Sequence, residues 1–130
     1  MTNAIIPILF LCFFGISEQK QYSKDYYSNG KLKSQGWLNQ NEKVDYWFYY
    51  YENGLKKEEG HYLGNKKTKW WIFYNSNEEI IRKSEYKDNK QNGLSILYKS
   101  GKICKAEKYK MGIKIKEWHN LMDYQKDNKE

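Results

Sequence analysis

The sequence predicts an all-β protein, an extended antiparallel meander of about four stacked β-hairpin repeats in a single-layer twisted sheet. Three observations lead to this prediction. The pattern of residues 26–119 recurs about every 24 positions, the apolar period within each unit is closer to two than to 3.6, and turn residues bound the segments. A repeat this short cannot bury its own apolar face, so neighbouring units are expected to stack into one array without a separate catalytic core.

The repeat is defined by residues that recur at a fixed offset. The recurring pairs are Tyr27 and Tyr51, Asn29 and Asn53, Gly30 and Gly54, Gly36 and Gly60, Lys43 and Lys67, Trp47 and Trp71, and Tyr50 and Tyr74. Four units follow, at 26–49, 50–73, 74–97 and 98–119, and the register drops one residue in the last, which aligns Ser95 with Trp118. The third unit is degenerate, since Asn77-Glu78 replaces Asn-Gly and Ser95 replaces Trp.

Each unit is predicted to form two strands of about five to eight residues, which gives about eight strands in total. The strongest hairpin signals are Asn29-Gly30 and Asn53-Gly54, because Asn and Gly tolerate the positive φ angles of a tight type I′ turn. A second set of turns is expected half a repeat later, at 41–43, 64–66, 88–90 and 111–112. The first strands of the four units are expected at 32–38, 55–63, 79–87 and 102–110.

The second strand of each unit presents two apolar faces, because successive strand residues alternate sides. One face is expected to carry Trp47, Trp71 and Trp118, joined by Tyr49, Phe73 and Leu97. The other is expected to carry Tyr46, Phe48, Tyr50, Trp70, Ile72, Tyr74, Leu94, Ile96 and Tyr98. Twist and curvature are expected to bury the tryptophan row between successive hairpins and to leave the tyrosine-rich face partly open.

The N-terminal segment differs from the rest of the chain. Residues 4–16 are apolar and uncharged, and Gly15 and Ser17 provide small residues before a cut at Glu18, so residues 1–17 are predicted to be a cleaved signal peptide. This predicts export to the periplasm or cell surface. The first four residues lack Lys and Arg, so the alternative is an uncleaved N-terminus that anchors the protein in the membrane. Residues 18–25 are expected to be a linker and 120–130 a flexible tail.

The formal charge of +7 is unevenly distributed along the chain. The fourth unit is the most basic, with seven lysines against Glu107 and Glu117. The candidate basic patch consists of Lys108, Lys110, Lys114 and Lys116. Such a patch suits an acidic partner or an anionic membrane surface, and a solvated lysine face that protects a sheet edge is the structural alternative.

The sequence contains no pattern of residues typical of an active site, and it predicts a protein that is not an enzyme. His61 and His119 are far apart, without the close His, Cys or carboxylate spacing of a metal site. Glu58 and Glu59 are expected on opposite faces of one strand, so they cannot act as paired carboxylates. No Gly-rich phosphate loop or nucleophile elbow is present. Accordingly, no catalytic residue, metal or cofactor is predicted.

One segment carries a family resemblance. Residues 50–67 read Tyr-Tyr-Glu-Asn-Gly-Leu-Lys-Lys-Glu-Glu-Gly-His-Tyr-Leu-Gly-Asn-Lys-Lys and are followed by Trp70-Trp71. This pattern resembles the bacterial variant of the MORN repeat, as in the YwqK-type antitoxin-like family, over about residues 24–119. The resemblance implies stacked hairpins that serve as an interaction surface without a catalytic centre. The chain departs from the pattern two residues before the tryptophan, where the family usually has Gly and this chain has Asp45, Lys69 and Lys116.

These observations favour a non-catalytic, exported scaffold for protein interactions, because Tyr and Trp anchors dominate interface energetics. The alternatives are an envelope-polysaccharide or anionic-lipid binding module, or an antitoxin-like protein that neutralises a partner protein if it stays in the cytosol. Nucleic acid ranks low, since sixteen acidic residues offset much of the charge. Open sheet edges also allow edge-to-edge pairing of copies. The candidate binding residues are Tyr50, Tyr74, Trp70, Trp47, Trp71 and Tyr98.

Overall fold

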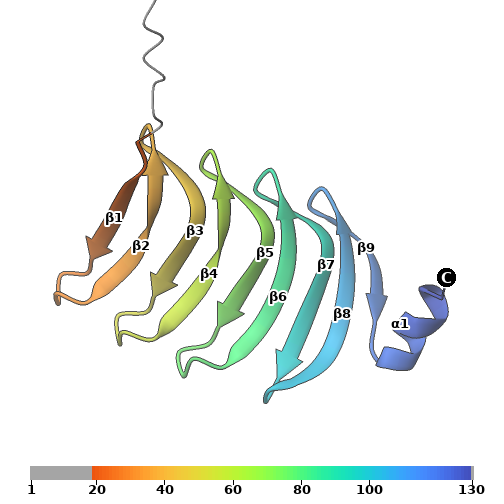
Figure 1. Ribbon diagram of the computed structural model, residues 1–130. Helices are drawn as coiled ribbons and strands as arrows, with labels where there is room; N and C mark the ends of the chain where they lie inside the picture. The colour runs from red at the N-terminus through yellow and green to blue at the C-terminus, as the bar shows by residue number, and fades with distance from the viewer. Residues whose placement is uncertain (1–18, 130) are drawn as a thin grey trace, which may run out of the picture.

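The structure, a computed structural model, describes residues 19–129. In this part of the chain nine antiparallel strands form one open, twisted sheet in sequence order, and one short helix follows (Figure 1). The predicted fold class, a single-layer meander of β-hairpins, is therefore confirmed. The predicted signal peptide, residues 1–17, lies outside the described residues.

The strand bounds follow the predicted repeat closely. The elements are β1 (Gln21–Tyr26), β2 (Leu32–Asn39), β3 (Glu42–Tyr50), β4 (Lys56–Leu63), β5 (Lys66–Tyr74), β6 (Ile80–Lys87), β7 (Lys90–Lys99), β8 (Lys102–Lys110), β9 (Ile113–Trp118) and α1 (Leu121–Asp127). One strand more is present than the sequence analysis predicts. The segment expected to be a linker contains β1, which pairs with β2 from Gln21↔Leu38 to Tyr26↔Leu32 and forms the N-terminal edge of the sheet.

Both sets of turns lie where the sequence places them, but the expected turn type is not found at Asn29-Gly30. Gly30 has positive φ and Asn29 does not, so Asn29-Gly30 is not a type I′ turn. The Asn29 side chain instead accepts a hydrogen bond from the Lys31 amide at 2.9 Å. Positive φ at both central residues occurs in the half-repeat turns, as at Gln40 and Asn41. Asn and Gly therefore mark a turn correctly, while the side-chain hydrogen bond of Asn decides its geometry.

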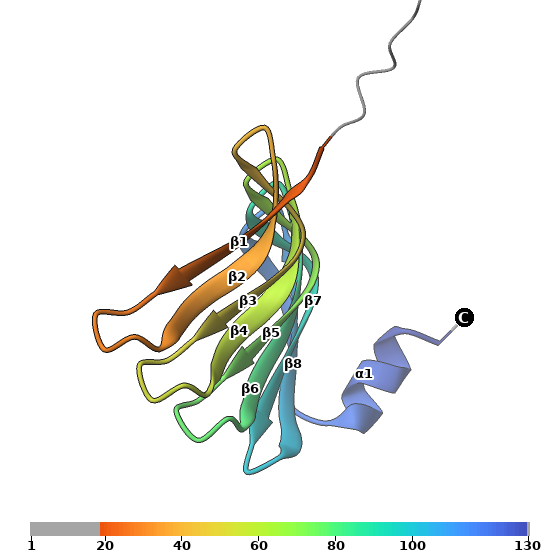
Figure 2. The same cartoon turned by 60° about the vertical axis from the view of Figure 1, so that its left-hand side comes forward.

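The two faces of the sheet follow from the strand register. Trp47 pairs with Gly60, and Gly60 pairs with Trp71, so these residues share one side, which we call the tryptophan face. Phe48, Ile72 and Ile96 lie on the opposite side, which we call the helix face because α1 lies on it. Figure 2 shows α1 to one side of the sheet beside β8.

The expectation that Trp118 joins the tryptophan row is wrong. Trp118 pairs with Ala106, which pairs with Ile96, so its side chain lies on the helix face. The hairpin of β8 and β9 skips only Ile115 in its bulge, whereas the hairpin of β4 and β5 skips two residues. A shift of one residue moves a strand side chain to the other face. Glu117 consequently occupies the tryptophan position of the last repeat.

The most buried large side chains are indoles that lie on glycine. Trp47 and Trp71 are 3% and 0% exposed, which confirms the predicted burial of these two residues. A Cβ atom at Gly60 would stand 2.3 Å from the Trp71 ring, and Gly36 has the same relation to Trp47. The Trp71 Nε1 donates a hydrogen bond to the His61 carbonyl at 3.0 Å. Glycine in the neighbouring strand therefore lets the ring lie flat on the backbone of a one-layer sheet.

The degenerate third repeat replaces this arrangement with a polar pair. Ser84 stands at the glycine position and Ser95 at the tryptophan position, and the two are paired across β6 and β7. Their hydroxyl oxygens are 2.6 Å apart, and both residues are buried. A Ser at the glycine position leaves no room for an indole, so the two substitutions belong together.

Neighbouring repeats are also joined through their turns. The Tyr27 hydroxyl donates to the Tyr50 carbonyl at 2.6 Å, and the Tyr51 hydroxyl donates to the Tyr74 carbonyl at 2.7 Å. The repeated Asn does the same, since Asn53 Nδ2 donates to the Ser76 carbonyl at 2.9 Å. The residues that define the sequence repeat thus form the contacts between hairpins, as nearest-neighbour stacking requires.

The segment expected to be a flexible tail contains α1. The Asn120 side chain accepts a hydrogen bond from the Asp123 amide at 2.8 Å and caps the helix. Tyr124 packs edge-to-face on Trp118, and the Trp118 Nε1 donates to Asp127 at 2.8 Å. A seven-residue helix is marginal alone, so its contacts with β9 hold it in place.

Candidate functional site

The tryptophan face is occupied by the protein's own lysines. The Lys43 Nζ lies 4.9, 5.2 and 5.3 Å from the ring centroids of Trp47, Tyr49 and Tyr62, and it donates to the Tyr49 hydroxyl at 2.7 Å. Burial lowers the pKa of Lys43 from its ordinary value. Three rings around an ammonium group are typical of sites that bind organic cations. Here the cation is intramolecular, so this site is filled.

The next repeat builds the same cluster around Lys67. Its Nζ lies 4.2, 5.2 and 5.5 Å from the ring centroids of Trp71, Phe73 and Tyr86, and 3.3 Å from the Glu58 carboxylate. The recurrence at Lys43 and Lys67 shows that the repeated lysine is part of the packing of this face. The face consequently offers a partner few uncovered aromatic surfaces.

The C-terminal end of the tryptophan face is charged. Glu107 is only 7% exposed, and its carboxylate forms ion pairs with Lys114 at 3.1 Å and with Lys105 at 3.4 Å. Glu117, in the tryptophan position, is also paired with Lys105 and Lys114. The hydrogen bond from Lys105 holds the pKa of the Glu117 carboxyl below its ordinary value. This ion-pair cluster ends the aromatic row.

The helix face has apolar rungs that alternate with charged ones. Phe48 on β3, Ile72 on β5 and Ile96 on β7 are half-buried, and they are separated by Glu59 on β4 and Lys83 on β6. In a one-layer sheet, nothing in residues 19–120 covers this face as a second layer. The half-buried rungs are thus the surface that a docking partner could cover.

A polar network connects residues of β3, β4 and β5 on this face. The Tyr46 hydroxyl donates to Glu59 at 2.9 Å, and Lys56 pairs with the same carboxylate at 3.0 Å while lying 5.1 Å from the centre of the Tyr74 ring. Burial, with the hydrogen bond to Glu59, raises the pKa of Tyr46. Tyr74 itself is 8% exposed. This network fixes Tyr46 and Tyr74 as structural residues.

The six predicted binding residues therefore differ in accessibility. Trp47, Trp71 and Tyr74 are buried and cannot anchor a partner without rearrangement. Tyr50 and Tyr98 are half-buried on the helix face, and the Tyr50 hydroxyl accepts a hydrogen bond from Gln35 at 2.7 Å. Trp70 lies on the same face and is 39% exposed. The structure thus brings Tyr50, Trp70 and Tyr98 to one accessible face.

The four predicted patch lysines do not form one patch. Lys114 pairs with Tyr109 across the strands on the tryptophan face, where Glu107 and Glu117 neutralise it. Lys116 and Lys108 face each other on the helix side, and Lys116 is paired with Asp127. Lys110 lies at the end of β8. Charge counts along the sequence do not reveal which lysines share a face of the sheet or which of them are neutralised by a carboxylate.

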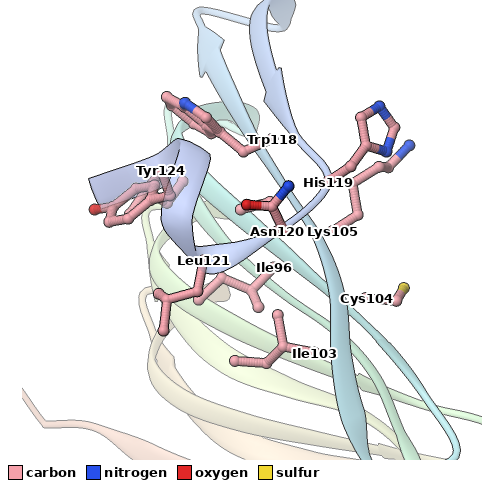
Figure 3. Close-up of a pocket in the computed structure, with 11 residues that line it drawn as sticks. Ile96, Ile103, Cys104, Lys105, Trp118, His119, Asn120, Leu121 and Tyr124 are labelled. Atoms are coloured by element: carbon pink, nitrogen blue, oxygen red, sulfur yellow. The ribbon is translucent and has the colours of Figure 1, made fainter. Parts of the chain in front are cut away.

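A pocket that the sequence analysis missed lies between α1 and the sheet. It has a volume of about 440 Å³, and its lining includes Leu94, Ile96, Ile103, Trp118, Leu121 and Tyr124. Figure 3 shows Ile96 and Ile103 on the side of the sheet that α1 covers. The spacing of Leu121 and Tyr124, three residues apart after the capping residue Asn120, was the available sequence signal for a short helix.

Within residues 19–129, no group of three or more His, Cys, Asp and Glu side chains could hold a metal ion. In the same range, no helix has the length and apolar character needed to cross a membrane. Comparison of the chain with protein-family models gave no match, and comparison with curated proteins found no similar sequence.

Proposed function

We propose that this protein is a non-catalytic scaffold that binds another protein through the helix face of its sheet. One observation carries the proposal: Trp70 is 39% exposed at the middle of this face. It stands on β5 beside the half-buried Ile72, between the apolar rungs of β3 and β7. The residues that dominate interface energetics are enriched in Trp, Tyr and Arg, and they are typically surrounded by contacts that exclude water.

The choice of face follows from how each side of the sheet is occupied. On the tryptophan face, Lys43 and Lys67 cover the rings, and Trp47 and Trp71 are buried. On the helix face Tyr46, Tyr50, Tyr98, Ile72 and Ile96 are half-buried, and α1 covers only the end near β7 and β8. A partner can therefore bury apolar area on the helix face without breaking an internal contact.

Two features of the sequence support this function and a location outside the cytosol. The resemblance of residues 24–119 to MORN-type repeats favours an interaction surface over a catalytic site. The apolar, uncharged segment 4–16 favours export, so the partner would be an envelope or extracellular protein. Determination of the mature N-terminus by mass spectrometry tests export directly, because cleavage after Ser17 leaves Glu18 as the first residue.

The binding experiment compares two equally exposed tryptophans. Trp70→Ala removes the central anchor, whereas Trp37→Ala removes a 40% exposed indole that lies at the β1 end and packs on Tyr22. We expect a protein recovered from envelope extract, and then purified, to bind the parent chain and Trp37→Ala but to lose at least tenfold in affinity for Trp70→Ala, as for a central anchor. Equal binding by all three chains, or recovery of polysaccharide alone, would contradict the proposal.

A further inference from the structure

The pocket under α1 has an apolar interior built from four elements. Leu94 and Ile96 come from β7, Ile103 and Ala106 from β8, and Trp118 with Tyr124 closes it from β9 and α1. Figure 3 shows Leu121 on the helix and Ile96 on the sheet, and both side chains line this space. Cys104 and Lys105 also border it, but the side chain of Lys105 forms ion pairs with Glu107 and Glu117 on the other face. The interior therefore offers little to a polar ligand, since an unpaired polar group is costly to bury there.

The rim of this pocket is cationic. Lys108 is the cross-strand partner of Leu94, and Lys83 is the cross-strand partner of Ile96, so both lysines lie on the helix face beside the pocket lining. Lys108 is exposed, and among residues 19–129 no carboxylate lies within ion-pair distance of its Nζ. Two acidic side chains lie on the same face and are already engaged: Glu85 accepts a hydrogen bond from the Leu94 amide at 2.7 Å, and Asp127 is paired with Lys116, the cross-strand partner of Lys108.

We propose that this pocket binds a long-chain carboxylate, with the alkyl chain under α1 and the carboxylate at Lys108. The volume of about 440 Å³ falls in the range of small-molecule pockets. The apolar lining matches the alkyl chain, and the positive rim complements the single anionic group. This site lies at the β7–α1 end; it shares Ile96 with the helix face but does not include Trp70, the anchor of the protein-binding surface proposed above.

The first test uses dodecanoate, at concentrations below micelle formation, with the full chain and with variants at equivalent positions of two repeats. Ile96→Asp places a charge in the pocket, and Ile72→Asp places the same charge one repeat earlier on the same face. Leu121→Asp changes the helix side of the pocket at a residue that is 69% exposed, so the fold does not depend on it. Circular dichroism of each variant confirms that the sheet is intact.

We expect saturable binding of one dodecanoate by calorimetry, at least tenfold weaker binding by Ile96→Asp and Leu121→Asp, and a change of less than twofold in Ile72→Asp. Absence of saturable binding by the parent chain would overturn the proposal. So would equal weakening by Leu121→Asp and Ile72→Asp, or binding that is seen only with lipid vesicles. If Ile96→Asp fails to fold, Leu121→Asp decides the outcome.

The second test concerns the head group. Lys108→Glu is expected to weaken dodecanoate binding by up to about fivefold, the scale of one exposed charge pair, and to leave dodecanol binding unchanged. Lys24→Glu, on β1 at the far edge of the sheet, is the matched charge control and should change neither ligand. Equal effects of Lys108→Glu on dodecanoate and dodecanol would show that the lysine does not contact the carboxylate.

Discussion

The packing of indole on glycine can be tested by converting the second repeat into the pattern of the third. Gly60→Ser adds a side chain whose Cβ would stand 2.3 Å from the Trp71 ring. The ring is 0% exposed and its Nε1 is bonded to the His61 carbonyl, so it has no free direction in which to move without losing contacts. The third repeat contains both substitutions already, as the hydrogen-bonded pair Ser84 and Ser95.

The expected cost follows from this geometry. Normal carbon contacts are about 3.5–4.0 Å, so the Trp71 ring must shift by more than about 1 Å to admit the new Cβ. Overpacking of this kind costs about 1–3 kcal/mol, and the lost hydrogen bond of Nε1 adds about 1 kcal/mol. Gly60→Ser alone should therefore lower the free energy of unfolding by about 2–4 kcal/mol. Trp71→Ser alone should lower it by about 3–5 kcal/mol through lost packing.

The double variant distinguishes a steric clash between position 60 and Trp71 from two independent losses of stability. Once Trp71 is replaced, the side chain at position 60 meets no ring, and the two hydroxyls can pair as Ser84 and Ser95 do. Gly60→Ser/Trp71→Ser should thus be no less stable than Trp71→Ser, which corresponds to a coupling free energy at least equal to the Gly60→Ser cost of about 2–4 kcal/mol. Guanidinium unfolding followed by far-ultraviolet circular dichroism measures all four chains. Additive costs, or a Gly60→Ser chain as stable as the parent, would refute the reasoning.

Two further predictions follow from the bulges and from α1. Lys69 has a φ angle of +59°, which is strained for a residue with a Cβ, so Lys69→Gly should raise the free energy of unfolding by about 0.5–1 kcal/mol in thermal or chemical denaturation. Lys66→Gly, in the same strand but without positive φ, should lower it. The hydrogen bonds from Lys116 and Trp118 lower the pKa of Asp127 from its ordinary 3.8. A lowered carboxyl pKa stabilises the docked helix above pH 3.8, and this contribution is lost as the pH falls through the lower folded value. The indole N–H resonance of Trp118 should report release of α1 in that acidic range, and Asp127→Asn should abolish the transition; a pH-independent resonance in the parent chain would contradict this.

Much of the sheet could be predicted because its signals are local. The period of 24 residues, the alternation of apolar side chains and the Asn and Gly residues place β2 to β8 and their turns within a few residues. The strand β1 was missed because its residues are polar, and pairing with β2 rather than its own apolar pattern defines it. The turn type at Asn29-Gly30 was also not predicted correctly, because Asn29 stabilises the turn through a side-chain hydrogen bond and does not have a positive φ angle.

The candidate site was harder to predict, because exposure depends on contacts between repeats. Trp47 and Trp70 have the same residue type, yet one is buried on Gly36 and the other is 39% exposed on the opposite face. The sequence identifies both as aromatic anchors, but only the register shows which has a glycine beneath it. The lysines of the basic end present the same difficulty, since ion pairs with Glu107 and Asp127 neutralise two of them.

A bulge that is one residue shorter in β9 accounts for two features of the C-terminal end that repeat counting could not predict. The shorter bulge turns Trp118 to the helix face, where its ring supports Tyr124 and its Nε1 holds Asp127. The same shift brings Glu117 into the tryptophan position, where Lys105 and Lys114 pair with it. Without the shift, the indole would lie on Glu107, whose side chain leaves no flat backbone surface for a ring. An indole at the tryptophan position of β9 is therefore sterically excluded, and Trp118 instead packs against Tyr124 and lines the apolar pocket under α1.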